Sequence, residues 1–250
     1  MTLPTRLRQV CLVAANIEPA ATDIPSVMGL NICYRDPNVG RFGLENILVP
    51  VGDVLLEVVA PIKDGTAAGR FVEKTQGRGG YMAILSCEDP RERGKNAEAM
   101  GVRTAHLIDR HPYLGVQLHP RDCRGAFIEF NHTANSDNLL GPYPPAGPDW
   151  HKAIKQDETQ ELTGITMESP DPEGLAAHWS RIIGYPVTNG TEVRLPNATI
   201  RFIKGPADLM SGLTFKVTDP EAILNRAKTR GLPVKGNMFA MSGVVFELTT

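Results

Sequence analysis

A fourfold repeat is the feature of this sequence that most constrains its fold. Four times, a strand-like apolar run leads to a helix-start residue and then, about a dozen residues later, to a glycine. The start residues are Asn16, Asp89, Asp171 and Asp219, and the glycines are Gly29, Gly101, Gly184 and Gly231. Asn and Asp side chains cap the free amides of a first helical turn, and glycine ends a helix in the left-handed conformation. The cap-to-glycine spacing is nearly identical in the four units, so we predict four helices of similar length.

Further β-like segments follow each helix. They cover residues 43–50 and 54–60 in unit one, 113–118 and 126–130 in unit two, 192–195 and 199–203 in unit three, and 236–241 and 244–248 in unit four. Each unit therefore has the order strand, helix, strand, strand, with room for one more strand. Four such βαβββ-type units predict an α+β protein built from curved sheets.

Composition narrows the range of partners. Charged residues make up 22% and hydrophobic residues 42% of the chain, which is typical of a globular protein. The net charge of -2 gives no basic excess, so we expect no nucleic-acid partner. No apolar run approaches the roughly 18 residues of a membrane span, and we expect no membrane partner. A small-molecule substrate and a monomer or homodimer are expected instead.

The four cysteines indicate a reducing compartment. Cys11, Cys33, Cys87 and Cys123 form no Cys-x-x-Cys pair, and three of them lie in apolar or strand-like runs. Buried thiols are the simplest interpretation, and the expected location is the cytoplasm.

A proline-rich and glycine-rich segment divides the repeats into two pairs. Residues 136–160 include the run Gly-Pro-Tyr-Pro-Pro-Ala-Gly-Pro at 141–148, which neither a helix nor a sheet interior tolerates. We predict that it links a domain at 1–135 to a second domain at 161–250. A lid over a pocket is the alternative.

Two stretches carry a resemblance to a known family. They are PVGDVLLEVVAP at 50–61 and LHPRDCRGAFIEF at 118–130, and the second is similar to the His-Pro-Lys-Asp-x-x-Gly-x-x-x-Glu ending of epimerases. Together with the repeat, they make the chain resemble the vicinal oxygen chelate superfamily, closest to its glyoxalase-like and epimerase-like branch. That superfamily includes glyoxalase I, methylmalonyl-CoA epimerase, bleomycin-resistance proteins and extradiol dioxygenases. The resemblance implies a glyoxalase-like fold, in which four modules pair into two half-open curved-sheet barrels.

The resemblance also implies a divalent metal, held inside a barrel by the first and last strands of each unit. The matching positions are Gln9 and Glu57 in unit one, and Tyr81 and Glu129 in unit two. The first-to-last interval is the same in both units, and the first-strand positions are as far apart in the sequence as the last-strand positions. An inward carboxylate is costly unless a cation or a donor meets it. We therefore predict Gln9, Glu57 and Glu129 as metal ligands, and both glutamates also as catalytic groups.

The remaining candidates surround this set. Tyr81 stands where such proteins usually carry His, so we expect it to donate to a substrate oxyanion, to transfer a proton or to replace the ligand. His119 is a further candidate ligand that could supply the missing imidazole. Arg35, Arg41 and Glu45 flank the expected barrel mouth and are candidates for substrate binding. Oxygen ligands favour Mg²⁺ or Mn²⁺, while Co²⁺, Ni²⁺, Zn²⁺ and a metal-free site stay open.

The second half lacks a comparable set. Its first-strand positions are Gly164 and Gly212, and its unit-three last-strand position is assigned to Phe202. Only Glu247 repeats the acidic pattern. We expect residues 161–250 to be a structural or substrate-shaping partner of the first half.

Three functions compete on this basis. The first is a metal-assisted isomerase or lyase that acts on a small oxygenated substrate through an enolate-like intermediate. The alternative is a metal-free small-molecule binding protein of the bleomycin-resistance type. The third is an extradiol dioxygenase, whose iron is held by two His and one carboxylate, a pattern that Gln9 and Tyr81 do not match.

Overall fold

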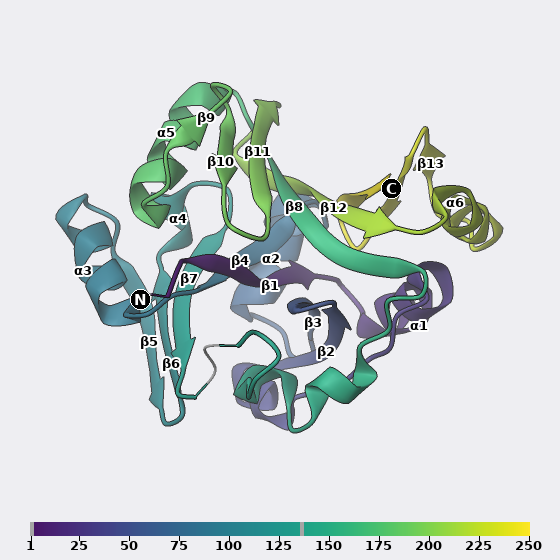
Figure 1. The fold of residues 1–250 in the computed structure, drawn as a ribbon, viewed down its shortest axis with the longest axis horizontal. Helices are drawn as coiled ribbons and strands as arrows, with labels where there is room; N and C mark the ends of the chain where they lie inside the picture. Colours follow the sequence, from purple (N-terminus) through teal and green to yellow (C-terminus); the bar gives the residue numbers. More distant parts are fainter. Residues whose placement is uncertain (1–2, 136–137) are drawn as a thin grey trace.

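The computed structural model describes residues 3–135 and 138–250, and it confirms the α+β architecture with four repeated modules (Figure 1). In all four predicted helices, the expected Asn or Asp side chain accepts a hydrogen bond from a backbone N–H of the first turn. These helices are α1 (Ile17–Met28), α3 (Pro90–Ala99), α5 (Pro172–Ile183) and α6 (Pro220–Thr229). No helix in the described residues has the length and apolar character needed to cross a membrane.

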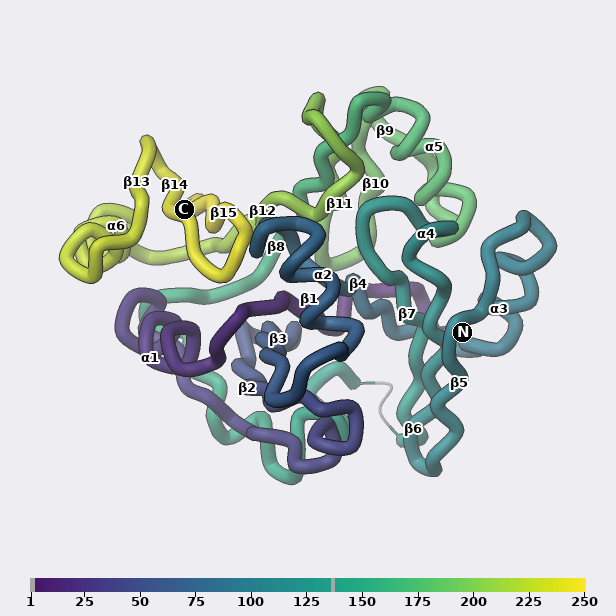
Figure 2. Tube along the Cα trace, turned by 180° about the vertical axis from the view of Figure 1, so that it is seen from behind, coloured from purple at the N-terminus to yellow at the C-terminus, as the bar shows by residue number. Residues whose placement is uncertain are grey.

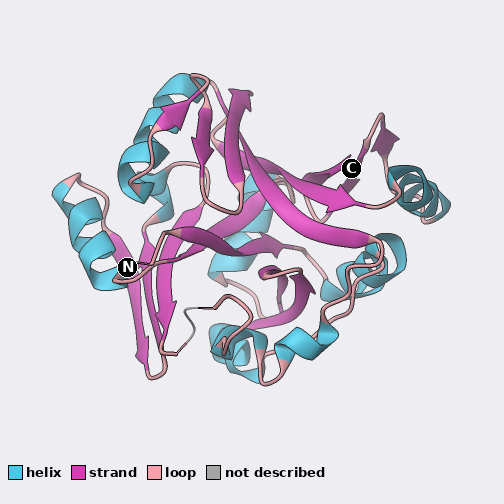
Figure 3. Ribbon diagram, viewed as in Figure 1, coloured by secondary structure: helices cyan, strands magenta, loops and turns pink. Residues whose placement is uncertain are grey.

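Strands make up most of the rest of each module (Figure 3). Module one contains β1 (Arg6–Val13), β2 (Leu44–Val51) and β3 (Val54–Pro61). Module two contains β4 (Gly80–Ser86), β5 (Thr104–Arg110), β6 (Tyr113–Leu118) and β7 (Phe127–Thr133). Module three contains β8 (Thr159–Ser169), β9 (Val187–Thr188), β10 (Glu192–Arg194) and β11 (Thr199–Lys204). Module four contains β12 (Leu209–Val217), β13 (Val234–Lys235), β14 (Met238–Met241) and β15 (Val244–Thr249).

The same pairing rule holds in every module. The first strand pairs in parallel with the last, as β1 with β3, β4 with β7, β8 with β11 and β12 with β15. The first strands of neighbouring modules then pair antiparallel, β1 with β4 and β8 with β12. Each half is therefore a curved, unclosed sheet, and the pair Met210–Gly80 joins β12 of the second half to β4 of the first.

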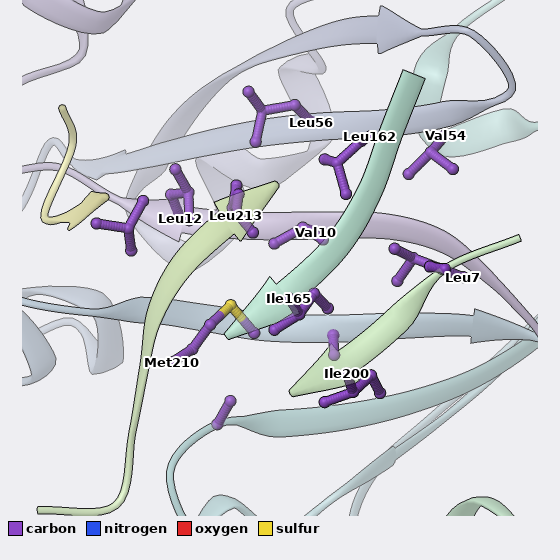
Figure 4. Close-up of a cluster of buried hydrophobic side chains, with 14 of the residues drawn as sticks. Leu7, Val10, Leu12, Val54, Leu56, Leu162, Ile165, Ile200, Met210 and Leu213 are labelled. Carbon is purple, nitrogen blue, oxygen red and sulfur yellow. The ribbon is translucent and has the colours of Figure 1, made fainter. Parts of the chain in front are cut away.

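The two halves share one hydrophobic core, which lies behind their concave faces. Figure 4 shows Leu7, Val10 and Leu12 of β1 facing side chains of the second half. Their partners there include Leu162 and Ile165 of β8, which are equally buried. Removing this much apolar surface from water fixes how the sheets stack, and it leaves the concave face of each half outside the shared core.

Two segments cover the first concave face. Helix α2 (Ala67–Thr75) was not predicted from the sequence, and the other segment lies where a linker or, as the alternative, a lid was predicted. Helix α2 packs beside β1 and β3 at one end, where Figure 2 shows it from behind. At the other end lie the 3₁₀ helices η2 (Pro144–Ala146) and η3 (Trp150–Ala153), within the segment expected to be a linker. Tyr143 and Trp150 are each only 2% exposed. We call residues 138–154 the cap; residues 136–137 of the expected linker lie outside the described part of the chain.

The cysteines agree with the prediction of unpaired thiols. All four cysteines are free thiols. Cys11, Cys87 and Cys123 are buried and Cys33 is partly buried. A short helix, α4 (Pro120–Cys123), and a 3₁₀ helix, η1 (Pro37–Phe42), complete the described elements.

Candidate functional site

The two glutamates predicted for the site occupy equivalent places in modules one and two. In the parallel pairs, Glu57 lies opposite Cys11, and Glu129 lies opposite Ile84. Cys11 and Ile84 are themselves equivalent residues of the two modules. The pair Val10–Ala83 lies on the local twofold axis between β1 and β4, and Cys11 and Ile84 each follow one member of that pair. Backbone register therefore places both carboxylates on the concave face of the first half.

The same register corrects the position of Tyr81. The equal intervals in the sequence predicted Tyr81 as the counterpart of Gln9. The pairing of β1 with β4 shows that the counterpart of each β1 residue lies one position further along the chain than those intervals predict. Met82 is thus the counterpart of Gln9, and a thioether replaces the expected donor. The helix caps in the sequence already indicated this longer offset, because the interval from Asn16 to Asp89 is one residue longer than the interval from Gln9 to Tyr81.

Tyr81 instead is the extra residue of a β-bulge in β4, where the pairing with β1 slips by one residue. A bulge redirects the side chain of the unpaired residue. The Tyr81 ring packs between Phe71 of α2 and Phe127 of β7, at centroid distances of 5.2 and 5.0 Å. Burial raises the pKa of Tyr81 to about 12, so its hydroxyl stays protonated and can donate a hydrogen bond.

Glu57 is held by amide donors and keeps part of its surface exposed. Gln9 Nε2 donates to Oε2 at 2.8 Å, and Asn46 Nδ2 donates to Oε1 at 2.6 Å. The Cys11 thiol, opposite Glu57 in the sheet, donates to Leu12 O at 3.6 Å. Burial raises the pKa of Glu57 despite these donors. Glu57 is partly exposed, whereas Gln9, Asn46 and Glu129 are buried, so Glu57 is the carboxylate of the pair that solvent reaches.

Glu129 lies deeper, with 2% of its surface exposed. Tyr113 OH donates to Oε1, and Gln117 Nε2 donates to Oε2 at 2.8 Å. Burial and the nearby negative charge of Glu57 raise the pKa of Glu129. Gly115 lies between the two donors on β6, and a Cβ there would approach Glu129 Oε1 to 3.0 Å. A glycine at this position lets the carboxylate come close to the strand.

The cap closes this cluster from above. Tyr143 OH donates to Gln9 Oε1 at 2.9 Å, so the cap is bonded directly to a predicted site residue. The Arg8 guanidinium carbon lies 4.1 Å from the centre of the Tyr143 ring and 5.0 Å from that of Trp150. Arg8 Nη1 donates to Asp53 O at 2.6 Å, whereas the buried Nη2 has no hydrogen-bond partner among the described residues.

Sequence reasoning missed several members of this cluster. They are Arg8, Cys11, Asn46, Tyr113, Gln117 and Tyr143. Period-two alternation could have found Tyr113 and Gln117, since Gln117 lies opposite Glu129 and Tyr113 is on the same face of β6. Nothing in the sequence indicates that Tyr143 reaches Gln9, because the path of a proline-rich loop is not set by local propensity.

The residues around the glutamates do not fit a divalent metal. All four carboxylate oxygens already accept hydrogen bonds from protein N–H or O–H groups. Gln9 turns its amide nitrogen toward Glu57 and gives its oxygen to Tyr143, so its oxygen does not point at the acids. Among residues 3–135 and 138–250, no group of three or more His, Cys, Asp or Glu side chains could hold an ion. The two-His-one-carboxylate set of an extradiol dioxygenase is likewise missing from these residues.

The other predicted site residues lie elsewhere. His119 is the N-cap of α4, and its Nδ1 accepts a hydrogen bond from the Arg121 backbone at 3.3 Å, which gives this ring a structural role. Arg35 pairs with Glu18 of α1 at 3.3 Å. The Arg41 guanidinium lies 4.6 Å from the centre of the exposed Phe42 ring. These arginines belong to the surface near η1.

Glu45 is the predicted substrate-binding residue that lies nearest to the cluster in sequence. It is partly exposed on β2, one residue before the buried Asn46 that donates to Glu57. Successive residues of a strand point to opposite faces, so Glu45 and Asn46 face different sides of the sheet.

The second half repeats the frame with different chemistry. Arg201 lies opposite Thr166, and Glu247 lies opposite Thr214, which makes them the counterparts of Glu57 and Glu129. The sequence assignment of Phe202 to this place was wrong by one residue, because Phe202 is buried in the shared core. Three modules thus carry a glutamate at the equivalent position, and module three carries an arginine.

Comparison with solved structures relates this arrangement to known proteins. A hypothetical protein from Staphylococcus aureus superposes with a TM-score of 0.69 at 12% identity, over 98% of this chain and 99% of that one. A mutant of 4-hydroxymandelate synthase from Streptomyces coelicolor gives a TM-score of 0.64 at 15% identity, over 93% of this chain and 76% of that one. The chain has the glyoxalase-like fold. The fold that the resemblance implied is thereby confirmed.

These similarities concern the fold alone. A methylmalonyl-CoA epimerase variant from Streptomyces coelicolor matches over 53% of this chain and 96% of its own, at 18% identity and a TM-score of 0.47. No protein-family model matches the sequence, and no curated protein matches it. Because one fold hosts many chemistries, the function has to be argued from the side chains.

Proposed function

We propose that the first half is a metal-independent enzyme that moves protons on a small oxygenated substrate, as an isomerase or lyase does. One observation carries this proposal: two carboxylates with raised pKa values lie in one cluster and are held by neutral donors. A carboxylate with a raised pKa is a stronger base, and its acid form persists nearer to neutral pH. Clustered groups with perturbed pKa values are typical of functional sites.

The geometry suggests a distinct role for each group. Glu57, the reachable carboxylate, takes a proton from the carbon next to a substrate carbonyl, and the bond's electron pair passes into an enolate. The protonated Tyr81 hydroxyl donates to the oxygen on which negative charge develops. Glu57 then returns its proton to the substrate, which balances the isomerisation. Glu129, buried beside it, has a pKa raised in part by the charge of Glu57, and it positions the cluster through Tyr113 and Gln117.

Exchange of substrate hydrogen for solvent deuterium tests this role directly. The protein is treated with EDTA and incubated in D₂O with 2-oxo acids, 2-hydroxy ketones and acyl thioesters, and exchange at the carbon next to the carbonyl is followed by NMR. We expect exchange with at least one of these classes, and Glu57→Gln should slow it by roughly 10²-fold or more. Glu247→Gln, a matched change in the other half, should leave the rate unchanged.

Two results would contradict the proposal. Exchange that persists in Glu57→Gln would remove the base from the mechanism. Exchange that EDTA abolishes and Mn²⁺ restores would show that the cluster rearranges around a metal.

A metal-free small-molecule binding protein is the second candidate. The cap favours it, because Tyr143 and Trp150 fill the mouth of the first barrel with apolar and hydrogen-bonding groups. If these cap residues move outward, they leave a space large enough for a ligand, and binding there requires no chemical step. Saturable binding of a carbonyl compound without deuterium exchange would decide in favour of this alternative.

A further inference from the structure

The concave face of the second half encloses a pocket of its own. The space has a volume of about 540 Å³, within the range of small-molecule sites. It lies against β8, β11, β12, β14 and β15, and Arg78 from the first half forms part of its rim. In contrast to the first half, no part of the cap lies among the residues that line it.

The walls of this pocket are mostly apolar. Ile203 and Val245 are 41% and 37% exposed, which is unusual for large aliphatic side chains. Leu209 and Met238 continue the apolar surface. Covering these side chains with a ligand would remove apolar surface from water, so the pocket favours a ligand with an apolar body.

One cation in this pocket is only loosely paired. Arg201 Nε lies 3.7 Å from Glu192 Oε1, and Arg201 Nη1 lies 3.8 Å from Glu247 Oε2. Both separations are longer than a hydrogen bond. Arg78 Nη2, by contrast, donates a hydrogen bond to Glu168 Oε1 at 2.9 Å. The guanidinium of Arg201 therefore keeps donors that can bind an oxyanion in the bidentate geometry that arginine favours.

We propose that the second half binds a free organic monocarboxylate with an apolar body. Its carboxylate is held by Arg201, and its body lies on the surface formed by Ile203, Leu209 and Val245. This site is separate from the glutamate cluster, since the two concave faces lie on either side of the shared core. Arg201 occupies the position that carries a glutamate in the other modules, so the exchange of one acid for a base sets the charge of the ligand.

Calorimetric titration of the full-length protein with sodium octanoate tests this site. We expect binding with one octanoate per chain, at least 10-fold weaker binding in Arg201→Gln, and partial recovery in Arg201→Lys. Ser211→Phe, which fills the pocket from β12, should abolish binding. Arg194→Gln is the matched control, because Arg194 also pairs with Glu192 but does not line the pocket. Thermal denaturation of each variant verifies that it is folded.

Charge and source of the ligand are tested in the same experiment. Octylamine and 1-octanol share the apolar body and should bind at least 10-fold more weakly than octanoate. No octanoate binding at millimolar concentration, or binding that Arg201→Gln and Ser211→Phe leave unchanged, would overturn the proposal. Tighter binding of a short peptide that ends in leucine would also overturn it, because the carboxylate would then come from a chain terminus.

Discussion

The two halves of this protein share one backbone plan and differ in what occupies their concave faces. In the first half, a pair of glutamates lies beneath the cap, and the interior is filled by the protein's own side chains. In the second half, an Arg–Glu pair faces a space of about 540 Å³. The difference shows that pairing register fixes where the glutamates and the arginine lie, whereas loop packing decides how much open space remains beside them.

Removing the cap's anchor should produce the largest effect on this contrast. Trp150→Ala should lower the free energy of unfolding by about 3–5 kcal/mol, because a fully packed aromatic ring is lost beside Arg8. Met238→Ala, in the open half, should cost less than about 1.5 kcal/mol, since that side chain is only partly buried. Urea denaturation measures both values. Similar losses for the two variants would show that the first barrel is no more tightly filled than the second.

The glutamate pair should give stability a distinctive pH dependence. Burial raises the pKa of Glu129 above its ordinary value of 4.5, so the folded state favours the protonated form. Its contribution to stability is therefore present below pH 4.5 and is lost as the pH rises through the raised pKa, with a slope of at most about 1.4 kcal/mol per pH unit.

Two variants isolate this effect. Glu129→Gln should flatten the decline of stability with rising pH, while Glu247→Gln should leave it in place, because that carboxylate is partly exposed. Denaturation curves at several pH values provide the measurement. A wild-type protein whose stability rises from pH 5 to 7, with Glu129→Gln unchanged in slope, would contradict the direction of the shift.

A cysteine under the cap reports its closure. Burial raises the pKa of Cys33 to about 12, and its thiol lies 3.7 Å from Ala146 O of the cap. Trp150→Ala should loosen this contact, lower the pKa and speed alkylation of Cys33 at pH 8 by roughly 10-fold. Cys123, in the shared core, should keep its slow rate in both proteins. Mass spectrometry after timed alkylation resolves the two sites.

The smallest effect is expected at the rim of the first half. Arg35→Ala should change the free energy of unfolding by less than about 0.5 kcal/mol, because its pair with Glu18 is solvent-exposed. It should also leave deuterium exchange unchanged. A large loss of exchange would restore Arg35 to the substrate site and would make the two halves more alike, with an arginine serving each.

The sequence predicted the frame of this molecule better than its interior. The four capped helices and the hairpins were predictable because caps, glycines and alternation act locally, as at Asn16 and Gly29. Glu57 and Glu129 were found because repeated modules place equivalent residues at equal intervals. Tyr81 and Phe202 were misplaced by one residue, since a bulge in β4 and the exact pairing of β11 with β8 are tertiary features. The contact of Tyr143 with Gln9 depends on the path of a loop that carries no local signal.

The cap is joined at both ends to the body that it covers, since it follows β7 and precedes β8. A segment that is covalently attached at both ends rebinds at a high effective concentration, so a diffusing molecule must compete with the cap for the same space. The apparent affinity of the first barrel for a ligand is therefore its intrinsic affinity multiplied by the fraction of molecules in which the cap is open. Substitutions that weaken the Tyr143–Gln9 hydrogen bond should therefore tighten ligand binding in the first barrel, even where they make no contact with the ligand.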